Sequence, residues 1–374
     1  MQQSNTMRII VFLTVIIGLI TFISPALLFS QEPEKTPAWY ETVSLNGFVS
    51  SAYSYNFNKP DTMKNSYRVF DFDDNSMKID VVELSLGKSA AKSGDVGFRL
   101  DLTAGSSIPQ VARSAGLNTG DLDFHQMYIS YNAPFGNGLR LDFGKFITSM
   151  GYEVIEGYDG FNDNYSRSFL FGYAIPFTHT GLRASYSFTN SFSATLMIVN
   201  GWDNAVDNNR SKSACLQLGI VPVSGMNFFV NFMVGPEKLK NTTDNRRMLD
   251  IVGTYVINDL ITVGMNVDYG TEEHSAINGG TAQWIGIAGY VRLNALKNVS
   301  LSIRGEQFDD RDGIRTGVIQ KLQEVTLTPE FRPVDHFIIR GDLRFDKSDR
   351  YVFQKENMWA RIQTTISINA IYMF

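Results

Sequence analysis

Charged residues in this chain repeatedly occur at every second position between apolar ones. In one segment, Arg340, Asp342 and Arg344 alternate with Leu343 and Phe345. Successive side chains of a β-strand point to opposite faces, so this segment has one charged and one apolar face. An Arg or Lys facing lipid at the middle of a bilayer costs about 2–4 kcal/mol, so in a membrane the charged face must line a polar lumen. Alternation alone would also fit a soluble β-sandwich, so other features of the chain are needed to distinguish a membrane protein from a soluble one.

The same alternation identifies the residues that would line such a lumen. The basic candidates are Arg99, Arg140, Arg183, Arg292, Arg304, Arg340, Arg344 and Arg361. The acidic candidates are Asp101, Asp142, Asp250, Asp268, Glu306, Glu324 and Asp342. Eight bases against seven acids leave the wall nearly neutral, so an ion preference would have to arise at the narrowest point. Four bulky side chains are also directed inward and would block the lumen in part, namely Phe146, Phe229, Trp284 and Tyr290.

The longest connection between these segments, 149–176, is the third of the long ones and is rich in acids. It holds four carboxylates against one arginine, and the carboxylates are Glu153, Glu156, Asp159 and Asp163. A loop of this length can fold back into a lumen and narrow it. We expect these acids to form a constriction facing Arg140, Arg183 and other wall arginines, and to favour cations. The alternative is an outward loop whose acids are solvated.

Other groups of residues give only weak evidence for catalysis or metal binding. A metal site needs ligands that converge, but the four histidines of the chain share no short spacing. They are His125, His179, His274 and His336. His179, Ser185 and Asn200 could form a phospholipase-like trio. The trio carries little weight, because any β-structure rich in Ser and Asn would offer one. The acidic clusters 71–74 and 309–312 are expected to be solvated loop tips, or alternatively to bridge divalent ions to lipopolysaccharide phosphates. We therefore expect no enzymatic activity, no cofactor, no metal and no nucleic-acid partner.

The elements that carry these residues are short alternating segments that recur along the whole chain of 374 residues. We predict sixteen strands, at 43–57, 77–89, 95–104, 122–133, 137–148, 177–188, 191–200, 211–221, 225–235, 246–257, 260–270, 281–293, 298–308, 320–331, 335–346 and 359–374. The connections alternate between short turns rich in Asn, Asp, Pro and Gly and long polar loops. Bacterial membrane barrels have an even strand count, short periplasmic turns and long outer loops. The pattern predicts an all-β, transmembrane, antiparallel up-and-down barrel over 43–374.

Both ends of the chain agree with export to an outer membrane. Arg8 precedes an apolar run at 9–23, and small residues then lead into the polar stretch after Ser30. This arrangement is typical of a signal peptide, predicted at 1–30, with a short periplasmic segment at 31–42; the alternative is a membrane anchor. Tyr372 and Phe374 end an apolar strand face, and they resemble the C-terminal assembly signal of bacterial outer-membrane barrels.

Three phrases within 144–209 carry a more specific resemblance. "GKFITSMGYEVIEG", "NYSRSFLFGYAIPFTHTG" and "NGWDNAVDNN" resemble the OmpL-like outer-membrane beta-barrel porins, the second putative porin family. The resemblance implies a passive channel for small hydrophilic solutes or ions. Its implied partners are outer-membrane lipid, the barrel-assembly machinery, such solutes and a second copy of the chain in a homo-oligomer. The alternative from another class is a closed structural or adhesive barrel whose outer loops bind a partner.

Overall fold

The computed structural model describes residues 42–108 and 122–374. The expected signal peptide and most of the segment that follows it lie outside these residues. None of the helices in the described ranges is long and apolar enough to cross a membrane.

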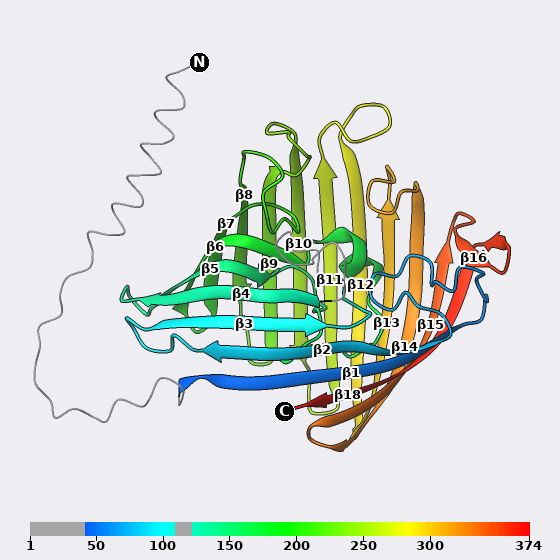
Figure 1. Cartoon of the computed structure of the whole chain (residues 1–374), viewed down its shortest axis with the longest axis horizontal. Coiled ribbons are helices and arrows are strands. Elements are labelled where there is room, and N and C mark those ends of the chain that lie inside the picture. The colour runs from blue at the N-terminus through cyan, green and yellow to red at the C-terminus, as the bar shows by residue number, and fades with distance from the viewer. Residues whose placement is uncertain (1–41, 109–121) are drawn as a thin grey trace, which may run out of the picture. The chain divides into compact units, whose positions relative to one another are not determined.

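Sixteen antiparallel strands of the described chain close into one barrel, and two short strands form a separate hairpin (Figure 1). The barrel strands are β1 (Ser44–Asn56), β2 (Ser76–Lys88), β3 (Val96–Ala104), β4 (Leu122–Ala133), β5 (Leu139–Ile147), β6 (Thr178–Thr189), β7 (Phe192–Val199), β8 (Ser213–Ile220), β9 (Met226–Pro236), β10 (Asn245–Val256), β11 (Ile261–Glu272), β12 (Ala282–Leu296), β13 (Val299–Asp310), β14 (Gln320–Val334), β15 (Phe337–Ser348) and β18 (Ile362–Met373). Each strand pairs with its neighbour in the chain, and β18 pairs with both β15 and β1. The predicted strand number and barrel topology are confirmed.

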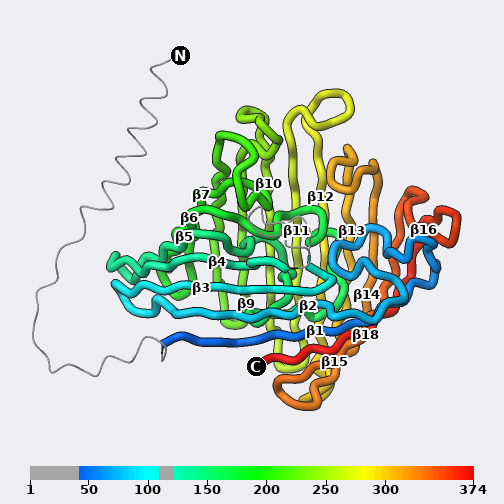
Figure 2. Tube along the Cα trace, in the orientation of Figure 1, coloured from blue at the N-terminus to red at the C-terminus, as the bar shows by residue number. Residues whose placement is uncertain are grey.

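The barrel is closed by the last residues of the chain. Gly47 N donates to Phe374 O at 2.8 Å, and Phe374 N donates to Gly47 O at 3.0 Å. The Phe374 ring occupies the space that a side chain on Gly47 would need, because a Cβ there would lie 2.3 Å from the ring. Figure 2 shows the terminal segment running alongside β1.

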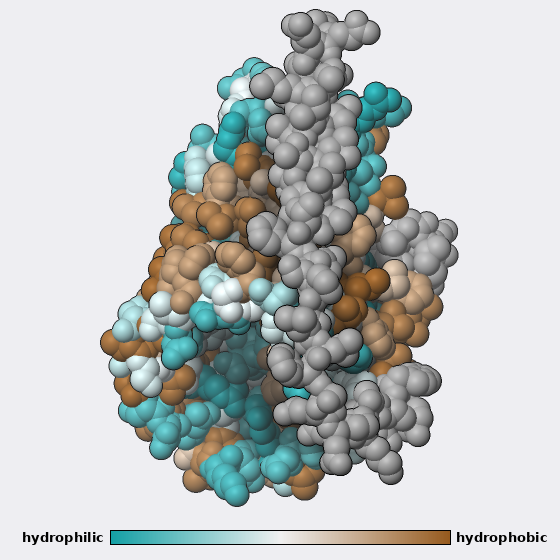
Figure 3. All heavy atoms as spheres, turned by 90° about the vertical axis from the view of Figure 1, so that its left-hand side faces the viewer, coloured by the Kyte–Doolittle hydropathy of each residue, from teal (hydrophilic) through white to brown (hydrophobic). Residues whose placement is uncertain are grey.

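The alternation separates an apolar exterior from a polar interior. On β18, Ile366 and Ile368 are 46% and 54% exposed, whereas Thr365 and Asn369 are 2% and 1% exposed. In the view of Figure 3, hydrophobic residues cover the middle of the wall and a hollow lined by hydrophilic residues opens below. This is the arrangement of a membrane barrel and the reverse of a soluble sandwich.

Long and short connections alternate as expected. The short turns, toward the left and bottom of Figure 1, are 89–95, 134–138, 190–191, 221–225, 257–260, 297–298 and 335–336. The long loops are 57–75, 105–121, 148–177, 200–212, 237–244, 273–281, 311–319 and 349–361, of which the second is described only to residue 108. The loops 200–212, 237–244 and 273–281 lie toward the top of Figure 1, and 349–361 lies toward the right. The first, third, fourth and seventh loops shape the interior described below.

One predicted strand is wrong at its start. The segment 359–374 is not a single strand, because β17 (Met358–Ala360) pairs with β16 (Phe353–Lys355) in the eighth loop. The chain bends at Arg361, whose exposed guanidinium lies 4.5 Å from the Tyr351 ring centre. Arg361 therefore does not line the lumen wall as expected, since this loop hairpin removes it from the strand.

Two β-bulges near the third loop change which residues face inward. Ser50 and Ser51 pair with Val81 and Ile79, which leaves Asp80 as the extra residue of β2. A second bulge leaves His125 as the extra residue of β4. A bulge shifts the inward-facing positions by one residue, so Asp80 and Val81 are both buried inside the barrel.

Candidate functional site: the third loop inside the barrel

The third loop (148–177) leaves β5, lies against the inner wall and returns to β6. It contains a short π-helix, η3 (Leu170–Ala174), packed against β12 and β11. Trp284 Nε1 of β12 donates to Ala174 O at 3.0 Å. Leu170 sits on Gly286, where an added Cβ would lie 2.6 Å from Leu170 Cδ1. The loop therefore packs closely on the wall, which a larger residue at position 286 would prevent.

A large apolar cluster forms between η3 and the inner wall. It joins buried loop residues such as Phe169 and Leu170 to inward-facing wall residues such as Phe146, Trp284 and Phe308. Tyr152 of the loop stacks on Tyr290 with ring centres 3.9 Å apart. These contacts fill part of the lumen with hydrophobic side chains. Such close packing stabilises the inward position of the loop.

Glu153 joins the loop to β13. Its carboxylate pairs with Arg304 at 2.6 Å, and Arg304 also pairs with Glu324 at 2.7 Å. The backbone N–H and hydroxyl of Ser168 donate to the other oxygen of Glu153 at 2.8 and 2.5 Å. Both oxygens are thus satisfied, so a carboxylate that is almost fully buried remains compatible with the fold.

Glu156 joins the loop to β15. Its two oxygens accept hydrogen bonds from Arg340 Nη2 at 2.7 and 2.8 Å, and Arg167 of the same loop lies 3.2 Å away. Asn162 N donates to the carboxylate at 3.0 Å. Burial by itself raises the pKa of Glu156, but the charges of Arg167 and Arg340 outweigh it and lower the pKa below its usual value. Glu156 is therefore a charged anchor.

Asp159 and Asp163 are the more exposed acids of the loop. Asp159 pairs with Arg99 at 2.9 Å and its side chain is 51% exposed. Asp163 pairs with Arg292 at 2.5 Å and its side chain is 30% exposed. The ion pairs of Asp159 and Asp163 are therefore open to water, in contrast to those of Glu153 and Glu156.

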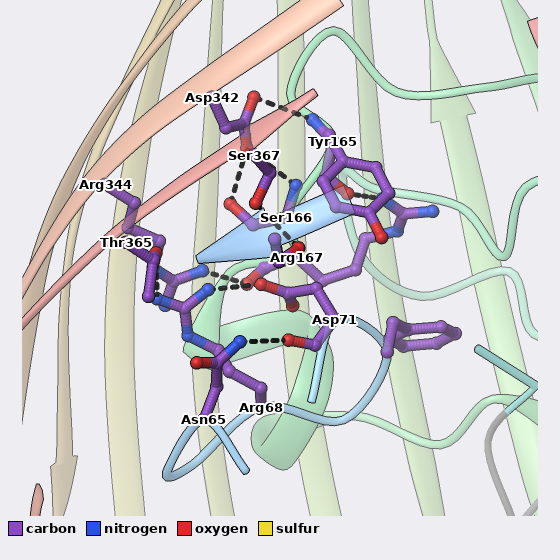
Figure 4. A network of polar contacts seen from close by, with 12 residues as sticks. Asn65, Arg68, Asp71, Tyr165, Ser166, Arg167, Asp342, Arg344, Thr365 and Ser367 are labelled. Atoms are coloured by element: carbon purple, nitrogen blue, oxygen red, sulfur yellow. Dashed lines mark hydrogen bonds and ion pairs between the residues drawn. The ribbon is translucent and has the colours of Figure 1, made fainter. Parts of the chain in front are cut away.

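Backbone groups of the loop bind a further acid of the wall, Asp342 of β15. Tyr165 N donates to Asp342 at 3.1 Å, and Ser166 donates through its N–H and hydroxyl at 2.7 Å each (Figure 4). Arg344 on the same strand donates to Arg167 O. Two neighbouring inward-facing residues of one strand therefore hold the same short stretch of loop.

The first loop (57–75) also enters this network. Arg68 pairs with Asp71 of its own loop and, at 2.5 Å, with Asp346 of β15. The Arg167 guanidinium lies 5.3 Å from the Phe70 ring centre, which links the first loop to the third. The expectation of solvated tips is wrong for Asp71 and Asp74 of this loop and for Asp310 of the second cluster, which are all buried. Asp74 accepts a hydrogen bond from Asn56 N at 2.6 Å, so these acids have structural partners.

The wall arginines do not all meet the loop. Arg99, Arg292, Arg304 and Arg340 bind the four loop carboxylates. Arg140 and Arg183, which were also expected to face the loop, form their ion pairs with Asp142 at 2.9 and 2.8 Å, and Arg183 lines a cavity together with Glu153 and Asp163 of the loop. Arg344 pairs with Asp346 at 2.6 Å. The acidic excess of the loop is therefore offset by four guanidinium groups of the wall, which weakens the expected source of cation preference.

Two large cavities lie beside the loop. The inner one, of about 640 Å³, is lined by loop residues together with wall residues that include Arg183, Gln217, Phe229 and Thr254. Phe229 and Thr254 lie close to the short-turn ends of β9 and β10. The outer cavity, of about 470 Å³, is lined by residues of the first, third, fourth and seventh loops. Phe177 lines both cavities.

The phospholipase-like trio of His179, Ser185 and Asn200 does not form a hydrogen-bonded site. His179 contacts Thr148 Oγ1 at 3.2 Å and Gly201 O at 3.1 Å, whereas Ser185 accepts from Thr195. Within the described ranges, no three or more His, Cys, Asp or Glu side chains gather as a metal ion would need.

Sequence reasoning missed several residues of this network, among them Arg68, Tyr165, Ser166, Arg167 and Phe177. The phrase "NYSRSF" gave a signal, since an arginine between serines in an acidic loop is a natural partner for its carboxylates. Arg68 sits three residues before Asp71 and offered a similar clue.

A closed barrel with an apolar exterior, a polar wall and a loop folded into its lumen defines the class of outer-membrane porins. The chain belongs to the family "Putative beta-barrel porin-2, OmpL-like", whose model matches residues 42–374. The protein is accordingly a porin of the bacterial outer membrane. No curated protein matches it in sequence.

Solved structures share the fold at low sequence identity. The outer membrane channel DcaP of Acinetobacter baumannii is 10% identical, with a TM-score of 0.60 over 89% of this chain and 97% of that one. An anion-selective porin from Comamonas acidovorans is 11% identical, with a TM-score of 0.60 over 89% and 99%. The trimer form of OmpT, an outer membrane protein of Vibrio cholerae, is 13% identical, with a TM-score of 0.56 over 89% and 99%.

Proposed function

We propose that the barrel passes small hydrophilic solutes and ions by passive diffusion along a water-filled path beside the third loop. The observation that carries this proposal is the inner cavity of about 640 Å³ between the loop and the wall. Polar groups of Asp163, Arg183 and Gln217 border it. Such groups can replace part of the hydration shell of a passing solute, which apolar walls cannot do.

The third loop is the narrowest point in this proposal. Its buried pairs with Arg304 and Arg340 support a fixed position inside the barrel, because separating either pair would leave a buried charge without a partner. The exposed acids Asp159 and Asp163, of which Asp163 borders the inner cavity, then act together with Arg99 and Arg292 on passing ions. Pore size is thus assigned to the part of the loop held by Glu153 and Glu156, and ion preference to Asp159 and Asp163.

Uptake into liposomes tests the proposal. Vesicles containing the refolded protein should swell in isotonic pentoses at a rate that rises with protein content, and more slowly in di- and trisaccharides. Protein denatured before reconstitution is the matched control. Equal rates for all sugars would contradict a narrow third loop, and no swelling with folded protein would contradict the channel.

A closed barrel remains the second candidate because of one observation. The apolar cluster around Trp284, Phe146 and η3 occupies part of the lumen, as a plugged barrel would require. In that case the outer loops would bind a partner and the folded protein would admit no sugar.

We also propose contacts beyond the solute. The exposed ring of Phe374 and its pairing with Gly47 support the assembly signal formed with Tyr372, read by the barrel-assembly machinery. The apolar exterior supports contact with outer-membrane lipid and, in part, with further copies of the chain.

A further inference from the structure

The outer cavity combines a cation with aromatic walls. Residues of four loops that lie far apart in the chain form it: Val69, Gly172, Tyr173, Ile175, Phe177, Trp202, Asp203, Asn204 and Arg315. Its volume of about 470 Å³ lies within the range of small-molecule sites, which are mostly apolar with a few placed polar groups. The cavity therefore has the size and composition to hold a small organic solute.

Arg315 is the cation of this cavity, and its surroundings hold it in place. Its Nε donates to Tyr173 O at 2.6 Å. Its guanidinium lies 4.7 Å from the ring centre of Trp202 and 5.3 Å from that of Trp284. Such contacts with aromatic faces are favourable and fix the plane of the guanidinium.

No carboxylate of the described residues forms an ion pair with Arg315, although three lie near it. Asp203 accepts from Phe177 N at 2.6 Å and Thr178 N at 2.9 Å. Glu272 pairs with Arg246, and Asp310 accepts from the backbone N–H of Arg315 and from Thr316. All three acids are thus engaged by other groups.

Burial, one neighbouring arginine and three neighbouring acids set the electrostatic environment of Arg315. Burial, and then the charge of the neighbouring Arg246, lower the pKa of Arg315 to about 10, so the group is still charged at neutral pH. The charges of Asp203, Glu272 and Asp310 offset part of this effect, but none of the three forms an ion pair with the guanidinium. An anion in direct contact with the terminal nitrogens would therefore add a charge-assisted hydrogen bond that Arg315 does not otherwise make. The hydrogen bond to Tyr173 uses Nε and leaves the terminal nitrogens of the guanidinium for a fork-like contact with a carboxylate.

We propose that the outer cavity is a binding site for small organic acids that carry a carboxylate on a planar apolar ring. The carboxylate binds the terminal nitrogens of Arg315, and the ring lies among Tyr173, Phe177 and Trp202. Since Phe177 also borders the inner cavity, a bound acid is placed at the entrance to the path beside the third loop. This inference rests on the proposed channel and adds to it a class of solute.

Calorimetric titration of the folded full-length mature protein in detergent tests binding without any need for conduction. The probes are benzoate, its neutral amide benzamide, and acetate, which has the charge without the ring. Benzoate should bind more tightly than either. R315Q should weaken benzoate binding by roughly tenfold or more, since it removes a charge-assisted hydrogen-bonded contact. R311Q, at an exposed arginine of the same loop, is the matched control and should bind as the wild type does.

Benzoate block of ion current in planar bilayers separates this inference from the proposed channel. Current that benzoate interrupts, with interruptions lost in R315Q and kept in R311Q, supports both. Arg315-dependent binding without any current supports the site and overturns the channel. Current with equal binding of benzoate and benzamide, or with unchanged benzoate binding in a folded R315Q, overturns the site and leaves the channel standing. The heat-modifiable shift in gel mobility shows that each variant is folded.

Discussion

Arg340 of β15 and Glu156 of the third loop form a buried ion pair in which one guanidinium nitrogen donates to both carboxylate oxygens. The two residues are 184 positions apart in the chain. Neither side chain is exposed to solvent, and the same guanidinium also donates to Asn162 O of the loop. This pair is the clearest connection between the loop and the wall.

Replacing Glu156 with Gln should release the third loop. The change leaves Arg340 and Arg167 buried without their shared anion, and breaking a buried pair in this way costs roughly 3–5 kcal/mol. We expect a lower temperature for the heat-modifiable transition and faster protease cleavage within the loop. D207N, at an ion pair with Lys212 that is open to solvent, should change neither. Wild-type behaviour of E156Q would mean that the pair does not hold the loop.

The same pair predicts a pH dependence. The folded state lowers the pKa of Glu156, so its contribution to stability is complete above the usual carboxylate pKa and is lost as the pH falls through the lowered value. The wild type should therefore lose loop protection on acidification in a component that E156Q lacks. Parallel pH profiles of protease cleavage in the two proteins would contradict this assignment.

Ion preference should respond to Asp159 more than to the buried acids. D159N removes an exposed charge and leaves Arg99 facing the pore with only Asp101, so the zero-current potential in a salt gradient should shift toward anions. The shift should weaken as the salt rises and the Debye length falls to ~3 Å at about 1 M. D207N is again the control. An unchanged potential would place Asp159 outside the ion path.

The orientation of the barrel predicts which insertions are accessible. A protease site inserted at Asn208 or Gly313, in the fourth and seventh loops, should be cleaved on intact cells. A site inserted at Asn190 or Val223, in short turns, should be cleaved only after the outer membrane is opened. Surface cleavage at the short turns would invert the orientation.

The sequence predicted which wall residues face inward or outward at most positions, but it predicted few contacts of the third loop. Alternation placed Thr365 and Asn369 inside and Ile366 outside, because the period of a strand fixes its faces. The bulges at Asp80 and His125 have no such signature, since one extra residue shifts the alternation without changing composition.

The partners of the third loop could not be predicted for a different reason. Arg140 and Asp142 lie two residues apart on one strand face and pair locally, which removes Arg140 from the loop. Glu153 instead meets Arg304, 151 positions later in the chain, and that choice depends on the path of the loop through the barrel. Hence the loop acids were predicted by residue, but the wall arginines that pair with them were not.

Single-channel recording of the folded wild-type protein in planar bilayers tests the central claim, an open path beside a fixed third loop. We expect stepwise, ohmic unitary currents of uniform size, because a loop held by buried pairs defines one constriction. Heat-denatured protein should give none. A folded, heat-modifiable protein that inserts without conducting would show that the third loop and its apolar cluster close the barrel, and would contradict the account.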